Sequence, residues 1–566
     1  MTTTPAPDLL VVGARARLAP GRYAAAIAVT GDRITAVGDD ADVLALRGSR
    51  TRVVQARGAT VLPGFQDAHV HAPFAGRNLL RVWLNDLPGR PAYLDAVARF
   101  AANHPNEPWV VGGGWAMEDF PNGLARKEDL DAIVPDRPVF LFNRDVHSAW
   151  VNSAALLAGG ITRDTVDPSD GRIERDPQTG EPTGMLHEGA AYTFNDRVVP
   201  PPSRLEWEEA ILTAQEHLHS LGITGWQDAW VTPSTLAAYR SLAADGRLTA
   251  RVVGALWWDR HRGLDQIADL CSQREATTGN HADSGVPGFH PTSVKIMVDG
   301  VLETYTGALL EPYCDGCGGH TDNRGLLYVD PELLAEAVTA LDAAGFQVHQ
   351  HAIGDRAART ALDAIAAART ANGRNDRRHH IAHLQVLQRS DIPRFSALGV
   401  TANAQAYWAK NDPQMEVLTT PFLGPDRTAL QYPFASLAAA GTRLAMGSDW
   451  AVTTADPLAQ IEVATTRSDP ADRELAAFLP HERLTLDAAL DAFTAGSAWV
   501  NHDDDGGAIR VGARADLAVL DADLFGTDLR IGTRAPIGGG PPHSLQGVSD
   551  ASVVMTVAAG RVVYEA

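Results

Sequence analysis

The chain has 566 residues and a formal net charge of −21, which results from 48 basic and 69 acidic side chains. Its length exceeds what one small hydrophobic core can organise, so we expect two or three domains. Because the excess negative charge repels phosphate groups and anionic lipid, the composition argues against nucleic acid or a membrane surface as a partner. The first residues contain no basic segment followed by an apolar core, and no apolar run reaches membrane length, so we expect a cytoplasmic protein.

The two ends of the chain predict β-structure. Residues 8–58 alternate short apolar runs with turn signals, which is typical of a β-meander, and residues 515–563 have the same character. Because chain termini often lie close together, we expect residues 1–59 and 507–566 to form one composite β-sandwich domain. The Gly- and Pro-rich stretch over 532–542 is expected to be a surface loop.

The middle of the chain predicts a parallel barrel. Apolar strand-like runs alternate with alanine-rich amphipathic helical patterns, the signature of repeated β/α units. Eight such runs occur, the number that closes a (β/α)8 or TIM barrel, and they cover residues 60–71, 223–230, 249–258, 292–299, 345–351, 379–385, 399–405 and 443–449. We therefore expect the α/β class, with a distorted barrel over residues 60–506. Residues 72–205 are too many for a loop, so they predict an α+β subdomain inserted after the first barrel strand.

Two histidines stand at the end of the first expected strand. Side chains at i and i+2 of a strand point to the same face, so His69 and His71 can bind one metal ion together. Such pairs also occur by chance, and the later strands strengthen the argument. His351, His383 and Asp449 lie on the fifth, sixth and eighth expected strands, near the C-terminal ends where active sites of this fold lie.

Lysine is scarce in this chain, which holds only Lys127, Lys295 and Lys410 and uses arginine for its other permanent cations. Only lysine offers a primary amine whose pKa burial can lower. Lys295, on the fourth expected strand, is therefore a candidate functional residue, whereas chance survival is the simpler interpretation of the other two.

The order His-x-His, Lys, His, His, Asp resembles the amidohydrolase superfamily. Residues 62–71, 147–152, 351–357 and 447–450 are similar to phrases of its amidohydrolase 3 group, which includes N-substituted formamide deformylases. The resemblance covers nearly the whole chain. It implies that Lys295 is carboxylated and bridges two metal ions, and it implies the following metal ligands: His69, His71, Lys295, His351, His383 and Asp449.

The resemblance implies a metal-dependent hydrolase that cleaves a non-peptide carbon–nitrogen bond in a small-molecule substrate, an N-acyl or N-formyl amine or a related amide. Zinc, as one or two ions, suits imidazole and carboxylate ligands, with manganese and iron as alternatives. A bound metal lowers the pKa of water from about 15.7 to about 7 and so supplies hydroxide. Asp449 is expected to act as general base and then as general acid.

Further residues are expected to contact the substrate. His147, in the insertion, and His349, on the same strand face as His351, could donate to a developing oxyanion. For His349, a position behind the metal ligands is the alternative. An aromatic pocket is expected from the tryptophans near the motifs, with plain core packing as the alternative: Trp115, Trp150, Trp408 and Trp450. Residues 301–306 depart from the small residues usual in the family and are expected to line the pocket.

Two other functions stay open. A mononuclear deaminase could use the same barrel with one metal, although it would not need Lys295. A catalytically silent scaffold would have lost ligands, and none is missing. The oligomeric state also stays open, with a homodimer among the alternatives.

Overall fold

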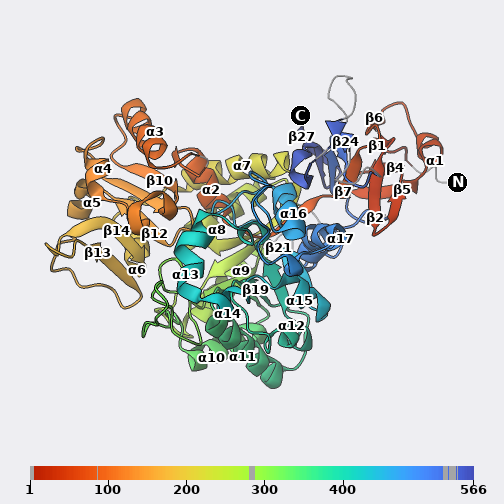
Figure 1. The fold of residues 1–566 in the computed structure, drawn as a ribbon. Helices are drawn as coiled ribbons and strands as arrows, with labels where there is room; N and C mark the ends of the chain where they lie inside the picture. The colour runs from red at the N-terminus through yellow and green to blue at the C-terminus, as the bar shows by residue number, and fades with distance from the viewer. Residues whose placement is uncertain (1–4, 86, 279–286, 527–532, 535–542, 545) are drawn as a thin grey trace.

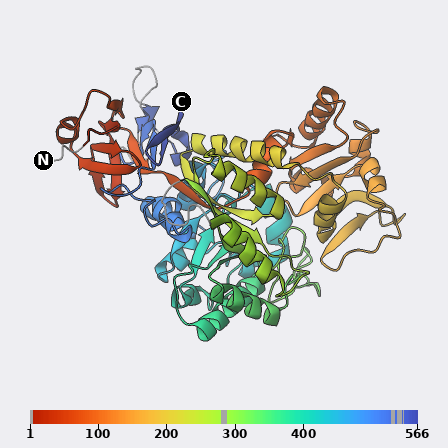
Figure 2. The ribbon, with the colours of Figure 1, turned by 180° about the vertical axis from the view of Figure 1, so that it is seen from behind.

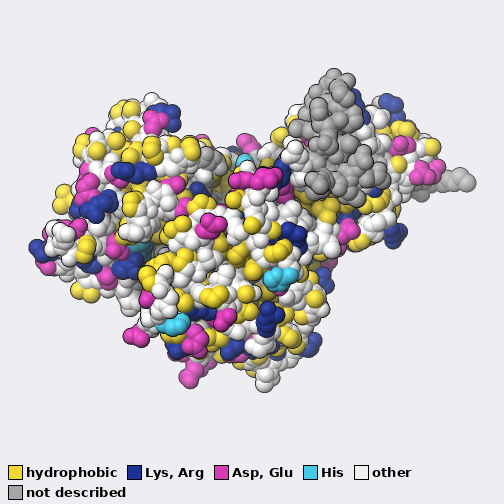
Figure 3. All heavy atoms as spheres, viewed as in Figure 1, with side chains coloured by type: hydrophobic (Ala, Val, Ile, Leu, Met, Phe, Trp, Pro, Cys, Tyr) yellow, Lys and Arg dark blue, Asp and Glu magenta, His cyan; other side chains and the backbone are white. Residues whose placement is uncertain are grey.

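The computed structural model describes residues 5–85, 87–278, 287–526, 533–534, 543–544 and 546–566. The expected surface loop over 532–542 therefore lies mostly outside the described residues. Within the described ranges, no helix has the length and apolarity needed to cross a bilayer. On the face shown in Figure 3, acidic side chains are scattered among basic and apolar ones, as expected of a solvated surface.

Eight parallel strands form the central barrel (Figure 1). Neighbours in the sheet follow chain order: β8 (Phe65–Val70), β15 (Ile223–Val231), β16 (Arg251–Trp257), β17 (Gly288–Met297), β18 (Gln347–Ala352), β19 (His380–His383), β20 (Thr401–Ala404) and β21 (Leu444–Met446). Beyond the last strand, Asp449 N donates to His69 O and His71 N donates to Trp450 O, both at 2.7 Å. These two bonds bring the end of the sheet back to its beginning. The predicted α/β fold with a distorted TIM barrel is confirmed.

Helices cover the outside of the barrel. α10 (Pro331–Ala343) shows why they form: Asp330 caps its N-terminus by accepting from the backbone N–H groups of Glu332 and Leu333. Its buried Leu334, Val338 and Leu341 recur at helical spacing and pack into the main core. Each such side chain contributes roughly 1.5–3 kcal/mol when fully buried. The same layer contains α7 (Arg204–Ser220), α8 (Pro233–Ala244), α11 (Asp355–Asn372) and α16 (Pro457–Thr466).

Both ends of the chain build two further sheets on one side of the barrel. The four-stranded sheet runs β5 (Arg33–Gly38), β4 (Ala26–Thr30), β1 (Leu9–Val12), β6 (Arg52–Gln55). The six-stranded sheet runs β27 (Arg561–Glu565), β26 (Val553–Ala558), β22 (Leu517–Leu520), β7 (Thr60–Pro63), β2 (Arg15–Ala19), β3 (Arg22–Ala24). Leu9 and Ile27 of the smaller sheet share a buried cluster with Val61, Val519 and Met555 of the larger one. The two sheets therefore enclose a common apolar core.

The expected first barrel strand over 60–71 is in fact two strands that divide at Gly64. β7 pairs with the terminal strands β2 and β22, whereas β8 enters the barrel. Gly64 N donates to Asp516 O at 2.8 Å, and a Cβ at Gly64 would lie 2.5 Å from the side chain of Thr224. Only glycine therefore fits where the chain passes from one domain to the other.

The insertion forms a separate lobe on the opposite side of the barrel from the terminal sheets (Figures 1 and 2). Its six-stranded sheet runs β13 (Gly171–Arg175), β14 (Pro182–Glu188), β12 (Ser148–Val151), β11 (Val139–Asn143), β10 (Val110–Trp115), β9 (Val82–Trp83). α3 (Arg90–Asn103), α4 (Lys127–Asp131), α5 (Ser153–Ala158) and α6 (Gly189–Arg197) belong to the same lobe. His147, directly before β12, and Glu188, at the end of β14, reach the barrel and are described below.

Candidate metal centre

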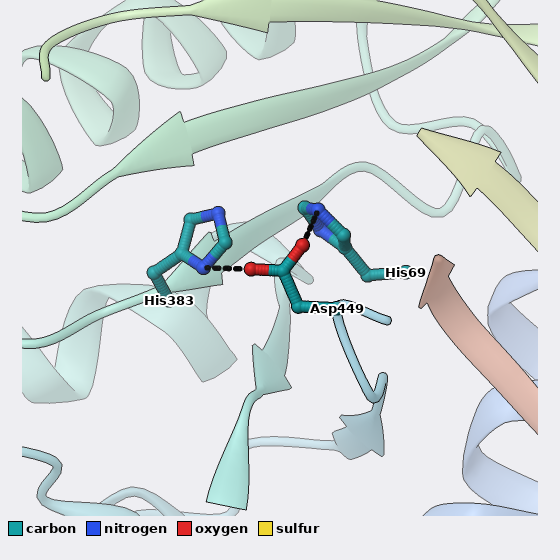
Figure 4. A group of neighbouring side chains, drawn as sticks. All are labelled: His69, His383 and Asp449. Carbon is teal, nitrogen blue, oxygen red and sulfur yellow. Dashed lines mark ion pairs between the residues drawn. The ribbon is translucent and has the colours of Figure 1, made fainter. Parts of the chain in front are cut away.

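Side chains from the first and sixth barrel strands and from the segment after the last one meet at the C-terminal end of the barrel (Figure 4). His69, His383 and Asp449 are buried, and each offers one ligand atom within 4.8 Å of the others. Asp449 Oδ1 lies 3.3 Å from His69 Nε2 and 3.1 Å from His71 Nε2, while Asp449 Oδ2 lies 4.0 Å from His383 Nδ1. One carboxylate thus faces three imidazoles.

Lys295 and His351 complete the predicted set. Lys295 Nζ lies 3.4 Å from His69 Nε2, and the side chain is buried. Burial penalises the ammonium form and lowers the pKa of Lys295 to about 7, although Asp449 and Asp228 act in the other direction. His351 Nε2 donates to Gly300 O at 3.2 Å, which leaves its Nδ1 lone pair for a ligand. All six predicted ligand residues line one cavity of about 50 Å³.

The donor set fits a divalent metal ion. Among the described residues, buried His383 Nδ1 has no hydrogen-bond partner, an arrangement that is costly unless a ligand satisfies it. Burial lowers the pKa of His69, His351 and His383 well below 6.5, so their rings are neutral and can offer lone pairs. His383 and Asp449 also adopt positive φ values of 77° and 57°, strain that is typical of functional sites.

A carboxylate on the first strand aligns the two strands that meet here. Asp67 Oδ1 accepts from His69 N at 2.9 Å and from Ser448 N at 3.0 Å. Because Ser448 precedes Asp449, these bonds fix the position of His69 relative to Asp449.

His349 lies behind the metal centre, the position that we gave as the alternative to a substrate contact. It is fully buried and is not among the residues that line either cavity described here. His349 Nδ1 donates to Gln227 Oε1 at 2.7 Å, so its Nε2 accepts from His69 Nδ1 at 2.9 Å. His380 Nε2 also donates to Gln227 Oε1, at 3.0 Å. This chain of donors leaves the lone pair of His69 Nε2 directed towards Asp449 and Lys295.

Replacing His349 with phenylalanine is therefore expected to weaken metal binding roughly 10- to 100-fold, because His69 loses the partner that sets its orientation. The measurement is titration of the metal-free protein with zinc. His481→Phe, which changes an exposed histidine in the same way, is the control and should bind metal as the wild type does. Wild-type affinity in H349F would show that His69 needs no such partner.

Of the four tryptophans considered, two belong to the insertion core and two lie near the candidate metal centre. Trp115 and Trp150 are fully buried with ring centroids 5.9 Å apart, and their Nε1 atoms donate to Leu141 O and Arg126 O. They line neither cavity, so the core-packing interpretation holds for them. Trp408 stacks on the His383 ring, with the two ring centroids 5.1 Å apart. Trp450 lines a second, larger cavity that is described next.

A larger cavity of about 340 Å³ adjoins the metal centre and shares Asp145, Trp408 and Val452 with it. Val301 and Glu303 of the expected pocket segment over 301–306 line this cavity. Its aromatic wall comprises Trp83, Tyr407, Trp408, Tyr432 and Trp450. The candidate metal centre therefore adjoins a second cavity that is large enough to hold another part of a substrate.

His147 lines the same cavity as the six candidate ligands. Its Nδ1 lies 2.9 Å from Glu188 Oε2, a residue that sequence reasoning missed. Burial acts to lower the pKa of His147, but the charge of Glu188 and the hydrogen bond to it outweigh burial and raise that pKa to about 9. Glu188 ends the buried strand β14, but Thr183, Gly184 and His187 interrupt the apolar pattern that identified the barrel strands, and the strands of the insertion were not assigned individually. Other cavity residues were missed as well: Tyr192, Trp230 and Trp257.

Comparison with known proteins gives three kinds of match. A family model described as amidohydrolase family matches residues 52–564. The protein YtcJ of Bacillus subtilis is 31% identical over 486 residues, which cover 84% of this chain and 87% of YtcJ. N-substituted formamide deformylase of Arthrobacter pascens is 28% identical over 530 residues, covering 91% of this chain and 94% of that enzyme. The solved structure of an uncharacterised metal-dependent hydrolase of Pyrococcus horikoshii is 22% identical, covers 91% of this chain and 97% of its own, and has a TM-score of 0.70, which shows a shared fold.

Proposed function

The chain belongs to the amidohydrolase family, and from that premise we propose that it hydrolyses a non-peptide carbon–nitrogen bond in a small N-acyl or N-formyl amine. The resemblance predicted from the motifs is confirmed, and with it a hydrolase of the metal-dependent superfamily. The proposal of carbon–nitrogen bond hydrolysis rests on one observation: all six expected ligands, including the buried Lys295, line a single cavity.

Zinc is the metal that we propose, since imidazole and carboxylate ligands suit it. The residues that would hold it are His69, His71, Lys295, His351, His383 and Asp449. When bound, the metal would activate water and polarise the scissile carbonyl. Lys295 would join the ligands as a carbamate, because a neutral amine in a buried site can add carbon dioxide and become an anionic oxygen donor.

The protein's own side chains would move the protons. Burial acts to raise the pKa of Asp449, but the hydrogen bond and charge of His71 outweigh it and hold the pKa below 3.8, so the carboxylate is ionised at neutral pH. Asp449 can therefore accept the proton of the attacking water and deliver it to the leaving amine. His147, from the cavity wall, can donate to the oxygen that gains charge in the transition state.

The two cavities suggest how a substrate divides between them. About 50 Å³ at the ligands suits a small acyl group such as formyl or acetyl, and the adjoining space of about 340 Å³ with aromatic walls suits a larger amine. The name of the Arthrobacter pascens relative, a formamide deformylase, agrees with a small acyl group.

The proximity of Lys295 to His69 argues against the alternative of a mononuclear deaminase, which would not need that lysine. The complete ligand set argues against a silent scaffold.

A panel of amides that share one aromatic amine and differ in the acyl group tests the proposal. We expect amine release from the N-formyl and N-acetyl members and at least roughly 10-fold lower kcat/KM for N-benzoyl, because the small cavity excludes a ring. The measurement is released amine with zinc-loaded protein. If metal is bound and no member of the panel is hydrolysed, the proposed function is wrong. A faster N-benzoyl substrate would reverse the assignment of the two cavities.

A further inference from the structure

Glu188, the last residue of β14, places a buried carboxylate beside the metal cavity. The residue has no exposed surface, and its φ of +53° is a conformation that costs a non-glycine residue roughly 1–3 kcal/mol. Its Oε2 lies 2.9 Å from His147 Nδ1. A strained and buried carboxylate persists only where surrounding contacts determine its position.

The other carboxylate oxygen is held by the barrel. Glu188 Oε1 accepts from Thr306 Oγ1 at 2.7 Å and from Thr304 Oγ1 at 3.3 Å, and both threonines follow β17. A Cβ at Gly300 would lie 2.7 Å from the same oxygen, so the glycine makes room for it. Glu188 therefore bridges the insertion, which supplies His147, and the barrel, which supplies the metal ligands.

The negative charge of Glu188 determines the protonation state of the His147 ring. A fully buried carboxylate is costly unless a cation and hydrogen-bond donors compensate it. Among the described residues, Glu188 forms an ion pair with His147 alone. His147 is therefore the compensating cation, with Nδ1–H donated to Glu188 and Nε2–H on the other edge of the ring. That ring lines the metal cavity, with its centroid 5.7 Å from that of His351.

We infer that Glu188 is a positioning residue for hydrolysis, which holds the His147 imidazolium so that its Nε2–H donates to the carbonyl oxygen of the scissile amide. This inference rests on the proposed function. Glu188 touches neither substrate nor metal in this role and acts only through His147. A preorganised donor of this kind stabilises the transition state more strongly than it stabilises the bound substrate, because the oxygen gains charge only in the transition state.

Glu188→Gln is the first test, because glutamine keeps the size of the side chain and an oxygen for Thr306 but removes the charge. We expect kcat to fall roughly 10- to 100-fold while KM changes little, since the interaction develops in the transition state. Glu181→Gln, an exposed position in the same lobe, is the matched control and should keep the wild-type kcat. Wild-type kcat in E188Q would overturn the inference.

A double-mutant cycle separates positioning from general damage to the fold. His147→Gln alone is expected to lose roughly 10²–10³-fold in kcat, the loss typical for one oxyanion donor. Adding E188Q to H147Q should then cost almost nothing further, because Glu188 has no other route to the reaction. Losses that multiply in the double variant would show that Glu188 acts elsewhere.

A nuclear magnetic resonance measurement provides a readout besides activity. Wild-type protein labelled with ¹⁵N-histidine should show a strongly deshielded ring N–H that is absent from H147Q, and E188Q should lose it while other histidine signals stay. A retained resonance in E188Q would overturn the inference even if kcat fell. A wild type that hydrolyses no amide overturns the proposed function and this inference together, whereas an active wild type with an unaffected E188Q overturns the inference alone.

Discussion

Lys295→Ala is expected to reduce the metal content of the purified protein from about two ions to one or none, and to reduce amide hydrolysis by roughly 10³-fold or more. Lys295 is buried, lies 3.4 Å from His69 Nε2 and shares one cavity with the other five ligands. Carbon dioxide adds to its neutral amine by forming an N–C bond with loss of one proton, and the resulting carbamate offers two oxygens that share one negative charge. Metal analysis by mass spectrometry beside an amine-release assay measures both effects.

Two comparisons sharpen the Lys295 experiment. Lys295→Arg keeps a cation but no primary amine, so it should lose metal and activity as K295A does. Lys127→Ala, which removes a lysine from the insertion, is the control and should keep both. Metal content and activity equal to wild type in K295A would contradict the bridging role.

The same residue predicts a pH dependence. Burial lowers the pKa of Lys295 from 10.5 to about 7, so the amine is neutral above about pH 7 and becomes an unreactive ammonium below it. Reconstitution of metal-free protein in bicarbonate buffer should therefore be complete above about pH 7 and should fail progressively as the pH drops. Uptake by K295A should not respond to bicarbonate at any pH. A bicarbonate effect of equal size in K295A would assign it to another group.

The barrel and the meeting of the candidate ligands at one end of it were predictable because parallel β/α units impose one geometry, whereas their role as ligands came from the family resemblance. Their C-terminal strand ends gather on one face, so residues as distant in sequence as His71 and Asp449 were expected to meet, and their side chains lie 3.1 Å apart. No knowledge of loops or of the insertion was needed for this step. Periodicity and strand order were sufficient.

Features that depend on pairing between distant segments could not be predicted. The apolar run through Gly64 looks continuous in sequence, and it divides because of contacts with Asp516 and Thr224. Trp115 and Trp150 are close to motifs along the chain but pack inside the insertion. Closeness in sequence was a poor guide wherever a side chain belonged to a different core from its neighbours.

His349 and Glu188 show two further features that the sequence does not reveal: how deep in the barrel a side chain lies, and which distant side chains it contacts. Residues i and i+2 of a barrel strand both point inward, but they are roughly 6.6 Å apart along the strand, so His349 lies a layer below His351. It therefore meets His69 from behind rather than the substrate. Glu188 depends on His147 and Thr306, 41 and 118 positions away in sequence, and neither pairing has a local signal.

Asp449→Asn is expected to lower kcat by roughly 10²–10⁴-fold, the range of general acid–base catalysis. Asparagine keeps the shape and one oxygen, but its amide can neither accept the proton of water nor return it to the leaving amine. Asp449 is also the residue that faces His69, His71 and His383 at 3.3, 3.1 and 4.0 Å, so some loss of metal affinity should accompany the change.

Saturating zinc separates these two consequences of D449N. At metal concentrations that fill the site, verified by metal analysis of the same sample, the loss of affinity is compensated and the loss of proton transfer persists. Asp322→Asn, which makes the same change at an exposed position, should be indistinguishable from wild type. If zinc-saturated D449N recovers the wild-type kcat, Asp449 is a ligand only, and the proton must move through another side chain of the cavity, with His147 as the first to test.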